Sequence, residues 1–215
     1  MRKVTELVLE AAEKAFAPVN RMLNYEPLRK VPVVVYSSRE VLSRNFGWDA
    51  NQSAMGVYWA GVMHILSPEA WIDVGDKNEY REIFMQQGPM IHEYTHYVVD
   101  SIAGGNYPRW LTEGIAQYVE RETTGYVFKS NPQEKEVLSI GELEASFDDS
   151  QKAGIAYRQS LELVDFLVDC YGEEILVRIL KRLGTGMTLS QTFKEELGIS
   201  LKEWEQEFAL WNQQN

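Results

Sequence analysis

The sequence predicts an α+β fold, with a small mixed α/β lobe at residues 1–105 packed against a helical lobe at residues 106–215. Two observations indicate this fold class. Runs rich in β-branched and aromatic residues lie in the first third of the chain, and helical signals dominate from about residue 79 onward. No repeat or linker divides the 215 residues, of which 45% are hydrophobic. We therefore expect a single domain over 1–215 with a substantial core, and we exclude the disordered classes.

The first lobe is predicted to begin with a helix, a strand and a short second helix. Apolar side chains recur at helical spacing over residues 3–24, and the β-branched run at 30–36 predicts a strand. Ser37 with Glu40 three residues later fits a capping box, so a helix is expected to continue to about Asn45.

Residues 54–66 are rich in Val, Gly and aromatic side chains, which predicts two strands or one long bent strand. Gly56 and Gly61 are expected at bends or where another part of the backbone approaches closely. His64 falls in the part of this segment that we expect to form the edge strand of the sheet.

Helices account for most of the remaining chain. One is predicted over 79–87, and Pro89 then suits the first position of a helix that reaches about Ala103 and ends at Gly104-Gly105. The next begins near Pro108 and is followed by a polar loop at 122–137. Further helices are expected at 139–147 and 153–170 and in three later segments, with capping boxes at Ser139/Glu142, Thr188/Gln191 and Ser200/Glu203.

The charge balance narrows the classes of partner. The chain has 21 Lys and Arg against 32 Asp and Glu, a formal charge of −11, which argues against nucleic acids and anionic membrane surfaces. No run of about 18 apolar residues predicts a membrane-spanning helix. Acidic residues interrupt the signal-like N-terminus, so we expect a cytoplasmic protein, or a secreted or anchored one whose leader has been removed. Nothing in the sequence points to a particular oligomeric state.

The segment His92-Glu93-Tyr94-Thr95-His96 lies inside the helix predicted to end near Ala103. Residues i and i+4 of a helix project from one face, so the imidazoles of His92 and His96 converge as two ligands of one tetrahedral Zn²⁺ require. Glu93 lies about 100° further round the helix, where its carboxylate can act as a general base on a zinc-coordinated water.

A catalytic zinc ion needs a third protein ligand and an open fourth position. The single cysteine, Cys170, cannot build a thiolate site, and the strongest candidate is Glu113 in Trp110-Leu-Thr-Glu-Gly114. The segment between His96 and Glu113 is long enough for the first helix to end and a second to return antiparallel. Two histidines and a glutamate form a ligand set typical of hydrolytic zinc sites.

HEYTH followed by WLTEGIAQYVE resembles the gluzincin class of zinc metallopeptidases, above all the bacterial peptidase-MA-like domains and more distantly thermolysin and the zinc aminopeptidases. The resemblance covers roughly residues 55–215 and implies a zincin-like fold that hydrolyses peptide bonds with Zn²⁺. It implies that His92, His96 and Glu113 are metal ligands and that Glu93 is the base. In the family a tyrosine hydrogen-bonds the oxyanion, and Tyr157 in Ala156-Tyr-Arg-Gln-Ser160 occupies the comparable place.

The zinc aminopeptidases carry a Gly-x-Met-x-Asn segment next to acidic residues that anchor the free amine of the substrate. The comparable segment of this chain, Ala60-Gly-Val-Met-His64, has no such acid, so the resemblance favours an endopeptidase acting on a peptide or protein substrate. Gly61, Met63 and His64 are candidate substrate-binding residues, because in this class an extended peptide pairs with the edge strand by β-augmentation.

Several assignments have alternatives. Asp100 and Gln117 could accept or donate hydrogen bonds behind the metal ligands, or Asp100 could be a solvated carboxylate at the helix end. Tyr157 could be an ordinary core residue, with Tyr126 as the competing oxyanion donor. At the level of function, the alternatives are a non-catalytic binding module with the same fold and a zinc hydrolase that acts on a non-peptide amide or ester.

Overall fold

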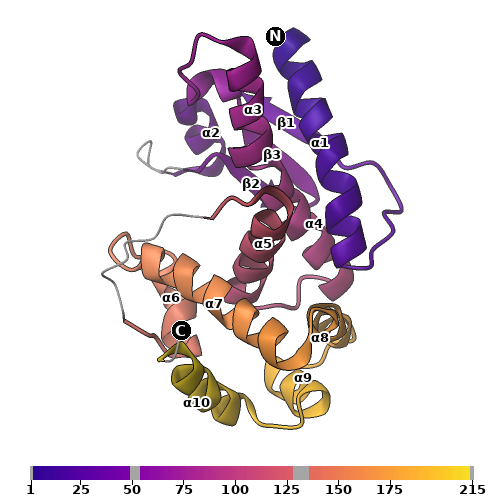
Figure 1. Ribbon diagram of the computed structural model, residues 1–215, viewed down its shortest axis with the longest axis vertical. Coiled ribbons are helices and arrows are strands. Elements are labelled where there is room, and N and C mark those ends of the chain that lie inside the picture. The colour runs from indigo at the N-terminus through magenta and orange to yellow at the C-terminus, as the bar shows by residue number, and fades with distance from the viewer. Residues whose placement is uncertain (1, 49–53, 128–135, 214–215) are drawn as a thin grey trace.

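The computed structural model describes residues 2–48, 54–127 and 136–213. It confirms the α+β fold class, with a small three-stranded sheet in the N-terminal half and helices elsewhere (Figure 1). In Figure 1 the sheet and α1 to α4 occupy the upper part of the molecule, and α6 to α10 occupy the lower part, with α5 between them. The division into lobes at 1–105 and 106–215 stays a prediction.

The N-terminal elements alternate between helix and strand. They are α1 (Arg2–Met22), β1 (Val33–Tyr36), α2 (Arg39–Phe46), β2 (Gly56–Trp59), β3 (Val62–Leu66), a short 3₁₀ helix (Pro68–Ala70), α3 (Lys77–Gln87) and α4 (Met90–Ala103).

The following elements are all helical. They are α5 (Arg109–Thr124), α6 (Ile140–Ser146), α7 (Ala153–Tyr171), α8 (Glu174–Gly184), α9 (Leu189–Glu196) and α10 (Leu201–Asn212). The polar loop expected at 122–137 begins later than expected, because α5 continues to Thr124, and half of the expected segment, residues 128–135, lies outside the described residues.

The sheet has the strand order β1-β3-β2, with β1 parallel and β2 antiparallel to β3. The segment 54–66 therefore forms two strands, joined by a tight turn in which Ala60 and Gly61 both have positive φ, 49° and 84°. The expectation that His64 lies on an edge strand is wrong, because β3 is the central strand and β1 and β2 are the edge strands. Local composition predicts a strand but does not determine its neighbours in the sheet.

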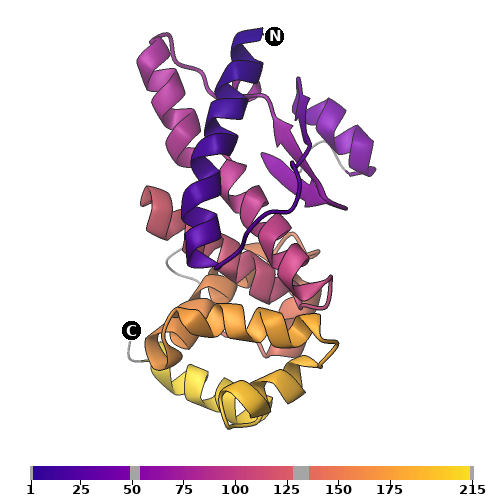
Figure 2. The ribbon, with the colours of Figure 1, turned by 90° about the vertical axis from the view of Figure 1, so that its right-hand side faces the viewer.

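The two faces of the sheet are covered by different helices. Met63 and Ile65 of β3 are buried in the main core together with residues of α1 and α4. The opposite face contacts α2, where Leu42 is buried. Figure 2 shows the sheet between α2 on one side and α1 and α4 on the other.

The helix ends mostly follow the predicted signals. The capping boxes at Ser139, Thr188 and Ser200 are confirmed. The cap of α2 is Ser38, whose Oγ accepts from the Val41 N–H at 3.4 Å, so the assignment to Ser37 is wrong by one residue. Pro89 is the residue that precedes α4, not its first helical residue.

Close packing between helices brings distant parts of the chain together. α5 lies against both α4 and α7, and it approaches α7 closely at Gly114, where an added Cβ would clash with the carbonyl oxygen of Ser160 and lie 2.6 Å from Cγ2 of Val164. Trp110 of α5 stacks on Trp204 of α10 with ring centroids 6.0 Å apart, and both rings are fully buried. Among the described helices, none is long and apolar enough to cross a membrane.

Candidate metal site

The helix that carries the HEYTH segment is buried along most of its length. Gly104 ends α4 in the left-handed conformation with φ 62°, and its N–H donates to the carbonyl of Asp100. Residues on both sides of the two histidines are buried, including Ile91, Tyr94 and Val98. This burial fixes the rotation of α4 about its axis, so the side chains of His92 and His96 are directed towards α5.

The helix that carries Glu113 has its first turn stabilised by another helix. The carboxylate of Glu144 in α6 accepts hydrogen bonds from the main-chain N–H groups of Arg109 and Trp110, at 3.1 and 2.9 Å. Pro108, the residue preceding α5, makes no side-chain cap of its own. A carboxylate at a helix N-terminus satisfies free donors and interacts favourably with the helix dipole. Glu144 therefore helps to fix the start of α5, one turn before Glu113.

Three potential ligand atoms converge between α4 and α5. Nε2 of His92 lies 3.3 Å from Oε2 of Glu113, and Nε2 of His96 lies 3.6 Å from the same oxygen. The two imidazole rings are nearly perpendicular, with centroids 4.7 Å apart. Two ligands bound tetrahedrally at about 2.0–2.1 Å are about 3.3 Å apart, so these spacings match the edges of a zinc coordination tetrahedron. The cluster of His92, His96 and Glu113 could hold a metal ion.

The second nitrogen of each imidazole has a partner on α5. Nδ1 of His96 lies 2.7 Å from Oγ1 of Thr112, and Nδ1 of His92 lies 3.5 Å from Oε2 of Glu120. Such contacts favour a proton on Nδ1 and leave Nε2 free for a metal. Sequence reasoning missed both partners. The available signal was position, because Thr112 adjoins Glu113 and Glu120 lies two turns further along the same helix face.

The two residues expected to support the ligands contact other groups. The carboxylate of Asp100 accepts from the hydroxyls of Tyr58 and Tyr107, at 2.6 and 3.2 Å. Nε2 of Gln117 donates to the main-chain carbonyls of Glu113 and Tyr157, at 3.2 and 2.8 Å. In the contacts described for these two side chains, neither reaches an imidazole. Asp100 fixes β2 and the α4–α5 turn to α4, and Gln117 links α5 to α7.

The charged forms of Glu113 and His92 stabilise each other. Burial disfavours ionisation of Glu113, but the nearby His96 and His92 outweigh it and hold the pKa of this carboxyl well below its usual range. Burial likewise opposes a charge on His92, but hydrogen bonds with Glu113 and Glu120 raise the pKa of its imidazole. An ionised Glu113 between two imidazoles is an environment that stabilises a cation.

Glu93 is buried, with 5% of its surface exposed, and it stands outside the three-ligand cluster. Burial is the main reason that its pKa is raised, and the charge of Glu113 adds to the effect. His92, His96 and a hydrogen bond from the backbone of Tyr58 act in the opposite direction. A carboxylate with a raised pKa is suited to accept and release a proton near neutral pH.

Tyr157 lies on α7, the helix that packs against α5. Burial raises its pKa to about 12, and the charges of Glu113 and Glu93 act in the same direction. Arg109 hydrogen-bonds the phenol and also stacks 4.6 Å above the ring of Phe147, which packs edge-to-face on Tyr157. Burial raises the pKa of the competing residue, Tyr126, and the charge of Glu120 adds to the effect. Of the two tyrosines, Tyr157 is the one influenced by Glu93 and Glu113.

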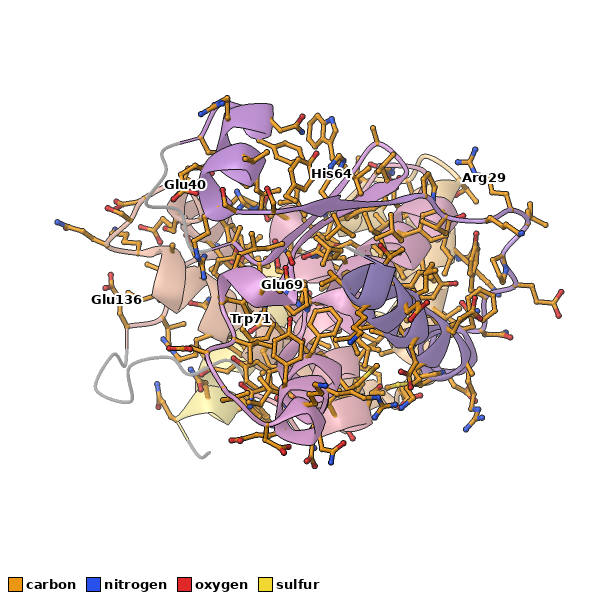
Figure 3. The ribbon with its side chains drawn as sticks, turned by 90° about the horizontal axis from the view of Figure 1, so that it is seen from above. Arg29, Glu40, His64, Glu69, Trp71 and Glu136 are labelled. Carbon is orange, nitrogen blue, oxygen red and sulfur yellow. The ribbon has the colours of Figure 1, made fainter. Side chains whose placement is uncertain are left out.

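The candidate substrate-binding residues of the hairpin have other contacts. Gly61 forms the turn, and Met63 is buried in the core with 2% of its surface exposed. Nδ1 of His64 is 2.8 Å from the hydroxyl of Tyr36, and its ring packs edge-to-face on Phe46 of α2. Figure 3 shows the labelled His64 on the α2 side of the sheet, away from α4. The substrate-binding role of these residues stays a prediction.

A pair of packed helices that presents two imidazoles, one carboxylate and a separate buried glutamate has the ligand pattern of zinc hydrolases. A comparison with protein families agrees with this class: the model of the family described as "Peptidase MA superfamily" matches residues 52–213. The chain belongs to the peptidase MA superfamily. This membership suggests a zincin-like metallopeptidase.

The chain is also similar to a bacterial protein of known sequence. It is 23% identical over 136 residues to "Uncharacterized protein YhcO" of Bacillus subtilis (strain 168). The match covers 59% of this chain and 41% of that protein, so the chain spans less than half the length of its relative.

Proposed function

We propose that the protein is a zinc-dependent metallopeptidase that cleaves internal peptide bonds. The observation that carries the proposal is the convergence of Nε2 of His92, Nε2 of His96 and Oε2 of Glu113 at spacings that match a zinc tetrahedron. Glu93 follows His92 directly yet lies outside the cluster, as a base must if it is not to occupy the metal. Membership of the peptidase MA superfamily supports the same reaction class.

The donor set favours zinc over other metals. Two imidazole nitrogens and one carboxylate oxygen suit Zn²⁺, whereas Ca²⁺ and Mg²⁺ prefer sites built from oxygen ligands. Cys170, the one cysteine of the chain, lies near the end of α7 and is not part of the cluster. Three protein ligands also leave the fourth position that a catalytic site requires.

The residues around the ligands supply the proton transfers. When bound, zinc supplies a Lewis acid that acidifies water and polarises the substrate carbonyl. Glu93 accepts a proton from the attacking water and delivers it to the departing amine, and its raised pKa suits both steps. Tyr157 donates its hydroxyl proton in a hydrogen bond to the carbonyl oxygen as negative charge develops there. With a pKa of about 12, its phenol remains protonated at neutral pH.

The hairpin argues for internal cleavage. Residues 56–66, which form β2, the turn and β3, contain no Asp or Glu. An aminopeptidase needs a negative group to hold the free amine of its substrate, and this hairpin supplies none. A longer peptide can instead pair with the exposed edge of a sheet through main-chain hydrogen bonds.

The test separates metal binding from catalysis. Purified protein should bind about one zinc ion per chain, and His96→Ala should lose it. Glu93→Gln should keep the zinc and lose cleavage of casein and of a mixed peptide library, and wild-type cleavage by this variant would contradict the base assignment. If zinc-loaded wild-type protein cleaves none of these substrates, the result would contradict the peptidase proposal and favour a non-catalytic binding module. Cleavage of amides or esters but not of peptides would indicate a different hydrolase.

A further inference from the structure

One edge of β2 carries backbone groups that do not pair with β3. The main-chain N–H of Leu66 donates to the carbonyl of Met55 at 2.8 Å, which makes residues 55 and 66 a hydrogen-bonded pair of the antiparallel ladder. Hydrogen-bonded and non-hydrogen-bonded pairs alternate along such a ladder. The backbone of Val57 therefore pairs with β3, whereas the backbone N–H and C=O groups of Gly56 and Tyr58 point away from β3, towards the open edge.

One of these outward groups is used by the candidate base. A backbone hydrogen bond from Tyr58 reaches the carboxylate of Glu93 on α4. An edge strand usually leaves such an N–H to solvent or to a partner strand. Here the contact joins the rim of the sheet to the residue that follows the first candidate ligand.

Gly56 permits this contact. A Cβ added at Gly56 would lie 2.7 Å from both Cγ and Oε1 of Glu93 and 2.8 Å from Cβ of Pro89. Real Cβ atoms essentially never approach other atoms this closely, so a larger residue requires the carboxylate or the strand to move. The sequence predicts either a bend or a close backbone approach at Gly56, and the structure places side chains there, those of Glu93 and Pro89.

The side chain of Tyr58 fixes the same strand to the same helix. Its hydroxyl donates to Oδ2 of Asp100 at 2.6 Å, two turns of α4 beyond Glu93. Tyr107, from the turn that follows α4, donates to the other oxygen of Asp100 at 3.2 Å. β2 is therefore attached to α4 at two positions, through the backbone at Glu93 and through a phenol at Asp100.

We propose that β2 positions the Glu93 carboxylate. The Tyr58 N–H orients the carboxylate, and Gly56 leaves room for it. The Tyr58–Asp100 hydrogen bond fixes the position of the strand along the axis of α4. This inference rests on the proposed role of Glu93 as the base. Gly56, Tyr58 and Asp100 act through Glu93 and touch neither the metal ligands nor the reacting atoms.

Gly56→Ala should displace the carboxylate without removing it. A misplacement on the order of 1 Å can cost about 100-fold in rate, so we expect kcat to fall by about 10- to 100-fold while KM and zinc affinity change by less than about threefold. Tyr58→Phe, which keeps the backbone N–H, should lower kcat by a smaller factor. Gly75→Ala is the matched control, because Gly75 is exposed and an added Cβ there meets nothing within 4 Å.

Amide hydrogen exchange tests the contact without any turnover. In the 215-residue chain studied by NMR, Glu93→Ala and Gly56→Ala should each accelerate exchange at the Tyr58 amide by about tenfold or more. Exchange at the Val57 amide, which pairs with β3, should change by less than about threefold. Equal acceleration at both amides would mean that the strand has detached and would overturn the proposal, as would an unchanged Tyr58 amide in Glu93→Ala.

The exchange result and the peptidase assay can fail independently. If the Tyr58 amide responds as expected but the wild-type protein cleaves no peptide, the positioning contact stands and the peptidase proposal fails. If Glu93→Gln abolishes cleavage but Gly56→Ala and Gly75→Ala both cleave at the wild-type rate, the peptidase proposal stands and β2 does not position the base.

Discussion

At the scale of single residues, the two candidate imidazole ligands are held by chemically different partners. Nδ1 of His96 meets a neutral hydroxyl, that of Thr112, whereas Nδ1 of His92 meets the carboxylate of Glu120. A carboxylate partner increases the basicity of a ligating imidazole, and a hydroxyl mainly fixes its orientation. The two contacts should therefore contribute differently to metal binding, although both partners lie on α5.

Zinc affinity measured by competition with a chelator separates these roles. We expect Glu120→Gln and Thr112→Val each to weaken zinc binding by about 10- to 100-fold, the range typical of such partners, with the larger loss for Glu120→Gln. Thr112→Ser keeps the hydroxyl and should remain close to the wild type. Asp100→Asn should also bind zinc normally, because Asp100 contacts tyrosines. A loss of affinity confined to Asp100→Asn would contradict this assignment.

Tyr157→Phe removes only the phenolic oxygen. If the phenol stabilises the developing oxyanion, kcat should fall by about 100- to 1,000-fold with little change in KM. Steady-state kinetics of Tyr157→Phe and Tyr126→Phe on the same peptide make the comparison. The opposite order of effects would transfer the role to Tyr126.

The sequence predicts that His92, His96 and Glu113 lie together because the geometry of this cluster is local. His92 and His96 are one helical turn apart, and Glu113 lies a short loop away on the next helix. Thr112 and Glu120 become partners only through the angle at which α4 crosses α5, and that angle depends on packing along both helices. Tyr58 lies on β2, far from Glu93 in the chain, so no sequence spacing predicts the contact between them.

At the scale of elements, the contact between α5 and α7 brings Glu113 and Tyr157 to the same place. Gly114 lies directly after the candidate ligand and faces the backbone of Ser160 and the side chain of Val164. Gln117 also donates to the carbonyl of Tyr157. The absence of a side chain at Gly114 thus sets the distance between the two helices.

Gly114→Ala should force α5 and α7 apart. Overpacking of a buried contact typically costs about 1–3 kcal/mol, and we expect the free energy of unfolding to fall by about this amount. Urea unfolding followed by circular dichroism measures it. Gly141→Ala is the control, since Gly141 lies in α6 and an added Cβ there meets nothing within 4 Å. Equal stability of both variants would show that the helices can adjust without cost.

The sheet illustrates what local patterns leave undetermined. Composition predicts that residues 54–66 are extended, and the hairpin confirms this. The strand order is decided by pairing between β1 and β3, which are far apart in the chain. For this reason local composition predicts an edge position for His64, whereas the residue lies on the central strand. The caps of Ser139, Thr188 and Ser200, which involve only four consecutive residues each, were predicted correctly.

At the scale of the whole molecule, buried tyrosines link its stability to pH. Burial raises the pKa of Tyr94, Tyr118 and Tyr157 to about 12 from an ordinary value of 10. In the unfolded chain these phenols ionise near pH 10, whereas in the folded chain they keep their protons until about pH 12. The stabilisation is therefore fully present below pH 10 and is lost as the pH rises from there to about 12.

The midpoint of urea unfolding should consequently be insensitive to these tyrosines below pH 10 and should fall steeply above it. Near-ultraviolet absorbance of phenolate, recorded on the same samples, should rise together with unfolding for the buried tyrosines. A midpoint that stays constant up to about pH 12 would contradict the prediction, as would full phenolate absorbance in protein that is still folded.

The helix pair α4–α5 contains most of the residues that would be needed to build this site in another protein. The three candidate ligands, the candidate base and both imidazole partners lie within residues 90–124. Tyr157, the rim of the sheet and Glu144, which fixes the start of α5, come from outside this segment. A designer could therefore graft the pair onto an unrelated helical scaffold and obtain metal binding first, then add a strand beside Glu93 and a phenol from a third helix as separate steps towards catalysis.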